Sequence, residues 1–152
     1  MPVDANEVLK AAKSVLVIDW PSEDVPESLA RAGLHVVVRG GPGPTDYSVW
    51  AWEDGRIVRR PLGRAPGQVD VVYAYRPLSE LPGIVDQARS LRAKKVWTQS
   101  GLSADGSKDP RGCWLSAAEL ESARTLVEAA GITHFASPYI VACLGSTGSE
   151  IR

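Results

Sequence analysis

The 152-residue sequence has few of the residues that stabilise small disulfide-rich or metal-binding domains. It contains two cysteines, Cys113 and Cys143, and two histidines, with no CxxC pair and no Cys/His cluster. This pattern argues against a structural zinc site and gives a poor basis for a disulfide framework. The formal net charge of −1 provides no overall attraction to nucleic acid or to an anionic membrane.

Long apolar runs are also absent. No run approaches the roughly 20 residues that a membrane span needs, and the N-terminal MPVDANEVLK has neither the charged nor the apolar region of a signal peptide. We therefore expect a cytoplasmic protein that binds neither membrane nor nucleic acid. The hydrophobic share of 44% and the charged share of 23% are typical of one globular domain with a sizeable core.

The central element of the sequence is Val69–Pro77, VDVVYAYRP. Five of its first six residues are Val, Tyr or Ala, without strict alternation, which predicts a strand covered on both faces. Pro77 ends this run, and a helical pattern begins near Ser79 and places Leu81, Ile84, Val85, Ala88 and Leu91 on one face. A buried strand that ends in a cation and leads into a helix is where open α/β sheets place ligands.

The rest of the chain alternates between strand and helix patterns. Strands are expected at 14–19, 34–38, 95–99 and 132–136, and helices at 5–12, 25–32 and 116–130. Residues 49–53 and 56–60 flank Asp54-Gly55 and predict a β-hairpin at the edge of the sheet. The predicted fold class is α/β: one doubly wound, mainly parallel sheet with an added edge β-hairpin. Residues 1–144 would form one domain with the hairpin insertion at 47–60, followed by a flexible tail at 145–152.

Ligands of such sheets bind beyond the carboxyl ends of the strands, where the direction of the connections reverses. We expect this crevice between the first strand and the central one. The helix N-termini at its rim expose free amide N–H groups, which suit a phosphate. The candidate binding residues are Asp19, Trp20, Pro21, Ser22, Arg39, Gly40, Tyr75, Arg76, Pro77, Gln99, Ser100 and Gly101.

The order SVLVID, LHVVV, VDVVYAYRP, AKKVWTQSG and AAGITHFASPYI resembles the small CoA-binding domain family. That family shares its Rossmann-type fold with the nucleotide-binding domain of the succinyl-CoA synthetase α subunit. The most specific part of the resemblance is Lys95-Val96-Trp97 with Gln99 and Gly101. The resemblance covers roughly residues 13–144 and implies that CoA or a related adenine nucleotide binds as the cofactor.

The loop after the first strand departs from the family pattern. The stretch Asp19-Trp-Pro-Ser-Glu-Asp24 has no glycine, so its backbone cannot approach a phosphate as closely as a glycine loop can. It also brings acidic residues to a place that should receive anions. Near the C-terminus, Ser137 and Tyr139 occupy the positions where the family carries Asp and Cys.

These features leave two functions open. In the first, the chain is a small-molecule binding module for CoA, acyl-CoA or another adenine nucleotide, without catalysis of its own. In the second, it is a degenerate CoA-binding-like domain that acts as a protein-interaction or regulatory subunit. An enzyme of acyl or hydride transfer ranks third, because no nucleophile–base pair is visible and Cys113 has no neighbouring histidine in the sequence.

The hairpin carries Trp50 and Trp52 two residues apart, so both should face the same side. Such a pair either covers neighbouring apolar surface or forms a contact for a homodimer or a protein partner. His35 and His134 each lie in an apolar strand pattern, and we expect both to be core or sheet-face residues without a metal.

Overall fold

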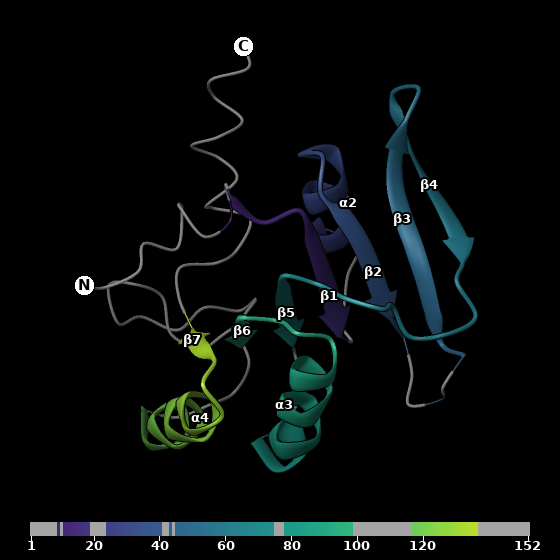
Figure 1. Cartoon of the computed structure of the whole chain (residues 1–152). Helices are drawn as coiled ribbons and strands as arrows, with labels where there is room; N and C mark the ends of the chain where they lie inside the picture. The colour runs from purple at the N-terminus through teal and green to yellow at the C-terminus, as the bar shows by residue number, and fades with distance from the viewer. Residues whose placement is uncertain are drawn as a thin grey trace.

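The computed structural model describes residues 9, 11–18, 24–40, 43, 45–74, 78–98 and 117–136. These residues form an α/β structure in which seven strands make one sheet with helices on both faces (Figure 1). The helices and strands, in chain order, are β1 (Ser14–Ile18), α2 (Asp24–Arg31), β2 (His35–Arg39), β3 (Tyr47–Glu53), β4 (Arg56–Pro61), β5 (Val71–Ala74), η1 (Leu78–Glu80), α3 (Leu81–Ser90), β6 (Lys95–Thr98), α4 (Ala117–Ala129) and β7 (Thr133–Phe135).

The strand order is β4-β3-β2-β1-β5-β6-β7. Strands β2, β1, β5, β6 and β7 are parallel, whereas β3 and β4 are antiparallel additions at one edge. The predicted doubly wound sheet with an edge hairpin is therefore confirmed. This arrangement is that of an open Rossmann-like sheet, in which the connections leave a central strand pair in opposite directions.

The central strands are buried on both faces, as their unbroken apolar sequences predict. All residues from Val15 to Ile18 have no exposed surface. Leu16 and Ile18 join a cluster with α3 and α4, whereas Val15 and Val17 join a second cluster with α2. We call the face of the sheet that packs against α2 the α2 face, and the opposite face, which packs against α3 and α4, the α3 face (Figure 1).

The predicted helical face of 79–91 is confirmed, because its five apolar positions in α3 and just beyond it are all buried.

The central strand is shorter than predicted, since β5 begins at Val71; Val69 is buried but lies before the strand. In this region Asp70 joins the amino ends of two strands. Its Oδ2 accepts hydrogen bonds from the backbone N–H groups of Lys13 at 2.6 Å and Ser14 at 3.2 Å.

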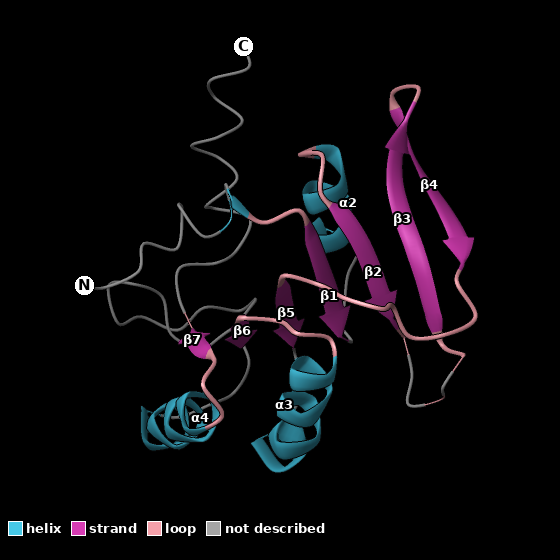
Figure 2. Ribbon diagram, viewed as in Figure 1, coloured by secondary structure: helices cyan, strands magenta, loops and turns pink. Residues whose placement is uncertain are grey.

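The hairpin turn has the predicted chemistry. Asp54 and Gly55 have φ angles of 53° and 77°, and a two-residue turn with two positive φ angles matches the right-handed twist of the flanking strands. Figure 2 shows β3 and β4 as the two strands at the edge of the sheet. No helix among the described residues is both long and apolar enough to cross a membrane.

Candidate functional site

The five parallel strands all end on the same side of the sheet. We call this side the carboxyl edge, which is distinct from the edge formed by the hairpin strands β3 and β4. Along the carboxyl edge β1 pairs with β2 on one side and with β5 on the other. From β1 the chain goes through α2 to β2, and after the hairpin it returns to β5 on the opposite side. The reversal of direction predicted between the first strand and the central strand is thus present, and it makes this edge the candidate site.

Two of the predicted binding residues, Arg39 and Gly40, lie in the described part of the chain, at the end of β2 and directly after it. Ten others lie outside the described residues: Asp19, Trp20, Pro21, Ser22, Tyr75, Arg76, Pro77, Gln99, Ser100 and Gly101. In sequence, these ten directly follow the last residues of β1, β5 and β6.

The side chain of Arg39 lies on the α3 face. It shares this face with Val37, two residues earlier in β2, which belongs to the core cluster of α3. Arg39 Nη1 donates a 2.9 Å hydrogen bond to Gln87 Oε1 of α3. Gln87 Nε2 in turn donates a 2.6 Å hydrogen bond to the hydroxyl of Tyr47, the first residue of β3. Arg39 is therefore held by a side chain from a helix 48 residues away in sequence.

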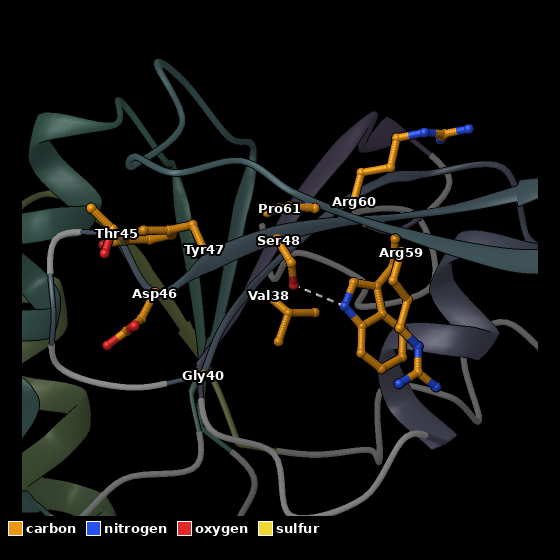
Figure 3. A pocket seen from close by; sticks show the side chains of 10 residues that line it. Val38, Gly40, Thr45, Asp46, Tyr47, Ser48, Arg59, Arg60 and Pro61 are labelled. Atoms are coloured by element: carbon orange, nitrogen blue, oxygen red, sulfur yellow. Dashed lines mark hydrogen bonds between the residues drawn. The ribbon is translucent and has the colours of Figure 1, made fainter.

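Gly40 borders a pocket of about 620 Å³ at the same edge (Figure 3). Its backbone N–H donates to the carbonyl oxygen of Asp46 at 3.0 Å. A Cβ atom at Gly40 would meet nothing within 4 Å, so a ligand can approach the backbone here. The Asp46 carboxylate accepts a 2.8 Å hydrogen bond from the Gly43 N–H, which closes the loop between β2 and β3.

The hairpin forms the far wall of this pocket. The guanidinium of Arg59 stacks on the Trp50 ring, with its carbon 4.0 Å from the ring centroid. Trp50 Nε1 donates a 3.1 Å hydrogen bond to Ser48 Oγ, drawn as a dashed line in Figure 3. Val38 faces the same space, whereas Arg60 extends away from it (Figure 3).

This wall was not predicted from the sequence, where the hairpin was expected to be an edge addition whose two tryptophans cover apolar surface or contact a partner. The signal that could have found it was the alternation of Ser48, Trp50 and Trp52 on one face of a strand that follows Gly40. The predicted common side of the two tryptophans is consistent with their contacts, since Arg59 stacks on Trp50 and Arg31 of α2 stacks on Trp52 at 4.8 Å. Trp50 is 8% exposed and Trp52 is 40% exposed, so the first covers apolar surface and the second faces solvent.

A partly buried polar pair joins the end of β6 to β7. Thr98 is 5% exposed, and its hydroxyl lies 2.6 Å from His134 Nε2 on β7. Burial lowers the pKa of His134 from 6.5 to about 4, the nearby Glu128 carboxylate opposes this shift, and the Arg124 guanidinium adds to it. His134 is therefore neutral at pH 7 and forms part of the sheet face, as expected.

Of the two places expected for His35, the core and a sheet face, the core is excluded: the residue begins β2, pairs with Ser14 of β1 and is exposed. Among the described residues, no group of three or more His, Cys, Asp or Glu side chains could hold a metal ion.

Comparisons with known proteins give one family and several similar folds. A family model described as a CoA binding domain matches residues 18–142, which is most of the chain. No curated protein matches.

Among solved structures, the chain is similar to cell-free ID.343 from Thermus thermophilus, with 20% identity and a TM-score of 0.55, covering 95% of this chain and 98% of that one. It is also similar to Prb, described as the PH1109 protein redesigned for binding, with 16% identity and a TM-score of 0.61, covering 95% and 94%. A hypothetical protein from Pyrococcus horikoshii OT3 has 18% identity and a TM-score of 0.56, covering 94% and 89%. At these identities the likeness shows the fold.

Proposed function

Because the chain belongs to the CoA-binding domain family, we propose that it is a small-molecule binding module for CoA, acyl-CoA or another adenine nucleotide, without catalysis of its own. The observation that carries this proposal is the position of Arg39. Its cation lies at the carboxyl edge of the sheet, one strand away from the reversal between β1 and β5. Open α/β sheets bind their ligands at this place.

Two features of the described residues fit such a ligand. The Nε atom of Arg39 is buried and has no hydrogen-bond acceptor within the described part of the chain, and a phosphate oxygen would supply one. The pocket beside Gly40 has about 620 Å³, which lies in the range of about 300–1,000 Å³ typical of small-molecule sites.

The charges suggest how a nucleotide would lie. The Asp46 carboxylate borders the pocket beside Gly40, and it would repel a phosphate but accept hydrogen bonds from ribose hydroxyls. We therefore assign the nucleoside part to the pocket and a phosphate group to Arg39. The ten predicted residues that follow β1, β5 and β6 remain part of the proposed site, and Arg76 is the second proposed phosphate ligand.

Calorimetric titration with CoA, acetyl-CoA, ADP and NAD tests the proposal directly. We expect measurable heat with at least one of them and a rise in melting temperature, because a ligand at 100 times its Kd stabilises the folded state by about 2.7 kcal/mol. Arg39→Met should weaken binding, whereas Arg56→Met, on the exposed far side of the hairpin turn, should leave it unchanged. No heat and no thermal shift at millimolar concentrations of all four compounds would reject the proposal.

A second function is favoured by one observation, the exposure of Trp52 on the edge hairpin. Here the chain would act as an interaction subunit, with Trp52 and Arg31 forming part of the contact. Size-exclusion chromatography with light scattering should then show a dimer that Trp52→Ser converts to a monomer. A monomer that neither this variant nor concentration alters would exclude self-association through the hairpin.

A further inference from the structure

Three polar side chains form a chain of hydrogen bonds across the α3 face of the sheet. They come from three separate elements: Arg39 from the end of β2, Gln87 from α3 and Tyr47 from the start of β3. The Arg39–Gln87 distance is 2.9 Å and the Gln87–Tyr47 distance is 2.6 Å. Tyr47 is 8% exposed, so the hydroxyl that ends this chain is carried by a fixed, packed ring.

The direction of these hydrogen bonds fixes the amide of Gln87. Because Arg39 can only donate, the oxygen of the amide must face the guanidinium and its nitrogen must face Tyr47. A flipped amide would bring two donors together at Arg39. Arg39 thus decides which way the amide faces, and the hydroxyl of Tyr47, which accepts from the amide nitrogen, holds the Gln87 side chain in place.

The hydrogen bond that Arg39 donates to Gln87 uses only one side of the guanidinium. It occupies Nη1, the nitrogen on the same side as Cδ, and leaves the opposite edge formed by Nε and Nη2. Nε on this edge is buried and, among the described residues, has no hydrogen-bond acceptor. The Nε–Nη2 edge presents two parallel N–H groups, the geometry that binds a phosphate or carboxylate through two oxygens.

We propose that Gln87, held in place by Tyr47, is a positioning residue that presents the Nε–Nη2 edge of Arg39 to an oxyanion of the ligand. The identification of that oxyanion as a phosphate of a nucleotide rests on the proposed function. A purely structural tie between β2 and α3 does not account for the arrangement, since a buried N–H without an acceptor costs stability.

The chemistry of Gln87 also suits this role. As a neutral acceptor it orients the guanidinium but leaves the positive charge available for an anion. A carboxylate at the same position would orient Arg39 equally well and would neutralise it. Gln87→Glu therefore separates orientation from charge, and Gln87→Leu removes the orientation by replacing the amide with an apolar side chain.

The experiment measures the Kd for CoA by calorimetry in the wild type and in Arg39→Lys, Gln87→Leu, Gln87→Glu and Tyr47→Phe. We expect Gln87→Leu to weaken CoA about tenfold and Tyr47→Phe about threefold, which are the sizes expected for losing a hydrogen bond to a charged group and to a neutral one. Gln87→Glu keeps its hydrogen bond to Arg39 and should also weaken CoA about tenfold, because its carboxylate offsets the positive charge. Gln68→Leu, in the exposed segment between β4 and β5, is the matched control and should not change the Kd.

Two readouts distinguish positioning from a general loss of structure. In the Arg39→Lys background, Gln87→Leu should cause no further loss, because lysine lacks the edge that Gln87 presents. Any affinity for adenosine or pantetheine, which have no phosphate, should be the same in all variants. Additive losses, or equal losses with the phosphate-free compounds, would overturn the proposal.

A parallel titration with pyrophosphate separates this inference from the proposed function. If the wild type binds pyrophosphate but no nucleotide, and Gln87→Leu weakens pyrophosphate about tenfold, the positioning role stands and the nucleotide function fails. If the wild type binds CoA and Gln87→Leu binds it equally well, the function stands and the positioning role is wrong. If neither compound binds, both are wrong.

Discussion

Acidification should destabilise the protein through His134, and the size of the effect can be worked out from its surroundings. In the folded state burial lowers the pKa of this imidazole from 6.5 to about 4, while in the unfolded chain it stays near 6.5. Between these two values the unfolded state binds the proton more readily than the folded state. The stabilisation is therefore complete above about pH 6.5 and is lost as the pH falls towards about 4.

The upper limit follows from the shift of the pKa. Each unit is worth about 1.4 kcal/mol, so the whole shift corresponds to roughly 3 kcal/mol at pH 4, and to about 2 kcal/mol at pH 5. His134 retains some contact with solvent, which screens the penalty of its charge, and about 1 kcal/mol is the expected loss at pH 5. The groups that face the ring from α4 and β6 are the Arg124–Glu128 ion pair and the Thr98 hydroxyl.

Urea unfolding of the wild type, His134→Gln and His35→Gln between pH 7.5 and 4.5 measures the effect. His134→Gln removes the titrating group, so its free energy of unfolding should fall by about 1 kcal/mol less than that of the wild type between pH 7.5 and 5. His35→Gln, at the exposed start of β2, is the control and should follow the wild type. If the pH profile of His134→Gln runs parallel to that of the wild type, His134 is not the group responsible.

Three further changes test the packing of the sheet. Asp70→Ala leaves the N–H groups of Lys13 and Ser14 without their acceptor and should cost about 1–3 kcal/mol in urea unfolding; an unchanged midpoint would show that water replaces the carboxylate. Trp50→Ala should cost about 3–5 kcal/mol because it empties a core position, and a loss below 1 kcal/mol would contradict the packing described. Trp52→Ala removes an exposed ring and should change the melting temperature only slightly, so a large decrease would mean that the ring is buried in solution.

The sequence was sufficient to predict the strand order along the chain and the class of the sheet. Patterns within single segments carried this information: the unbroken apolar run of β1, the apolar face of α3 and the Asp54-Gly55 turn. Gly33 and Gly131 follow the helical segments expected at 25–32 and 116–130, and both have positive φ angles, 98° and 80°, as is typical after the end of a helix. Each of these features depends on residues that are neighbours in sequence.

The hydrogen bonds of the candidate site could not be predicted in the same way. Gln87 lies 48 residues from Arg39 and 40 residues from Tyr47, and nothing in the sequence of a helix shows which strand its polar residues will reach. The one available signal was the position of Gln87 beside the apolar face formed by Ile84, Ala88 and Leu91. A long polar side chain at that border can reach over the end of a neighbouring strand.

Arg39 and Gly40 were predicted to belong to one binding site. Strand geometry, however, places the side chain of Arg39 on the opposite face of the sheet from the pocket that Gly40 borders. Successive residues of a strand point to opposite faces, so Arg39 lies on the α3 face with Val37, while Val38 faces the pocket on the α2 face together with Trp50. A single ligand that reaches both the pocket and Arg39 must therefore cross the end of β2. Gly40 is the residue at that crossing, and a Cβ there would meet nothing within 4 Å; under the proposed function, the ligand would pass over its backbone.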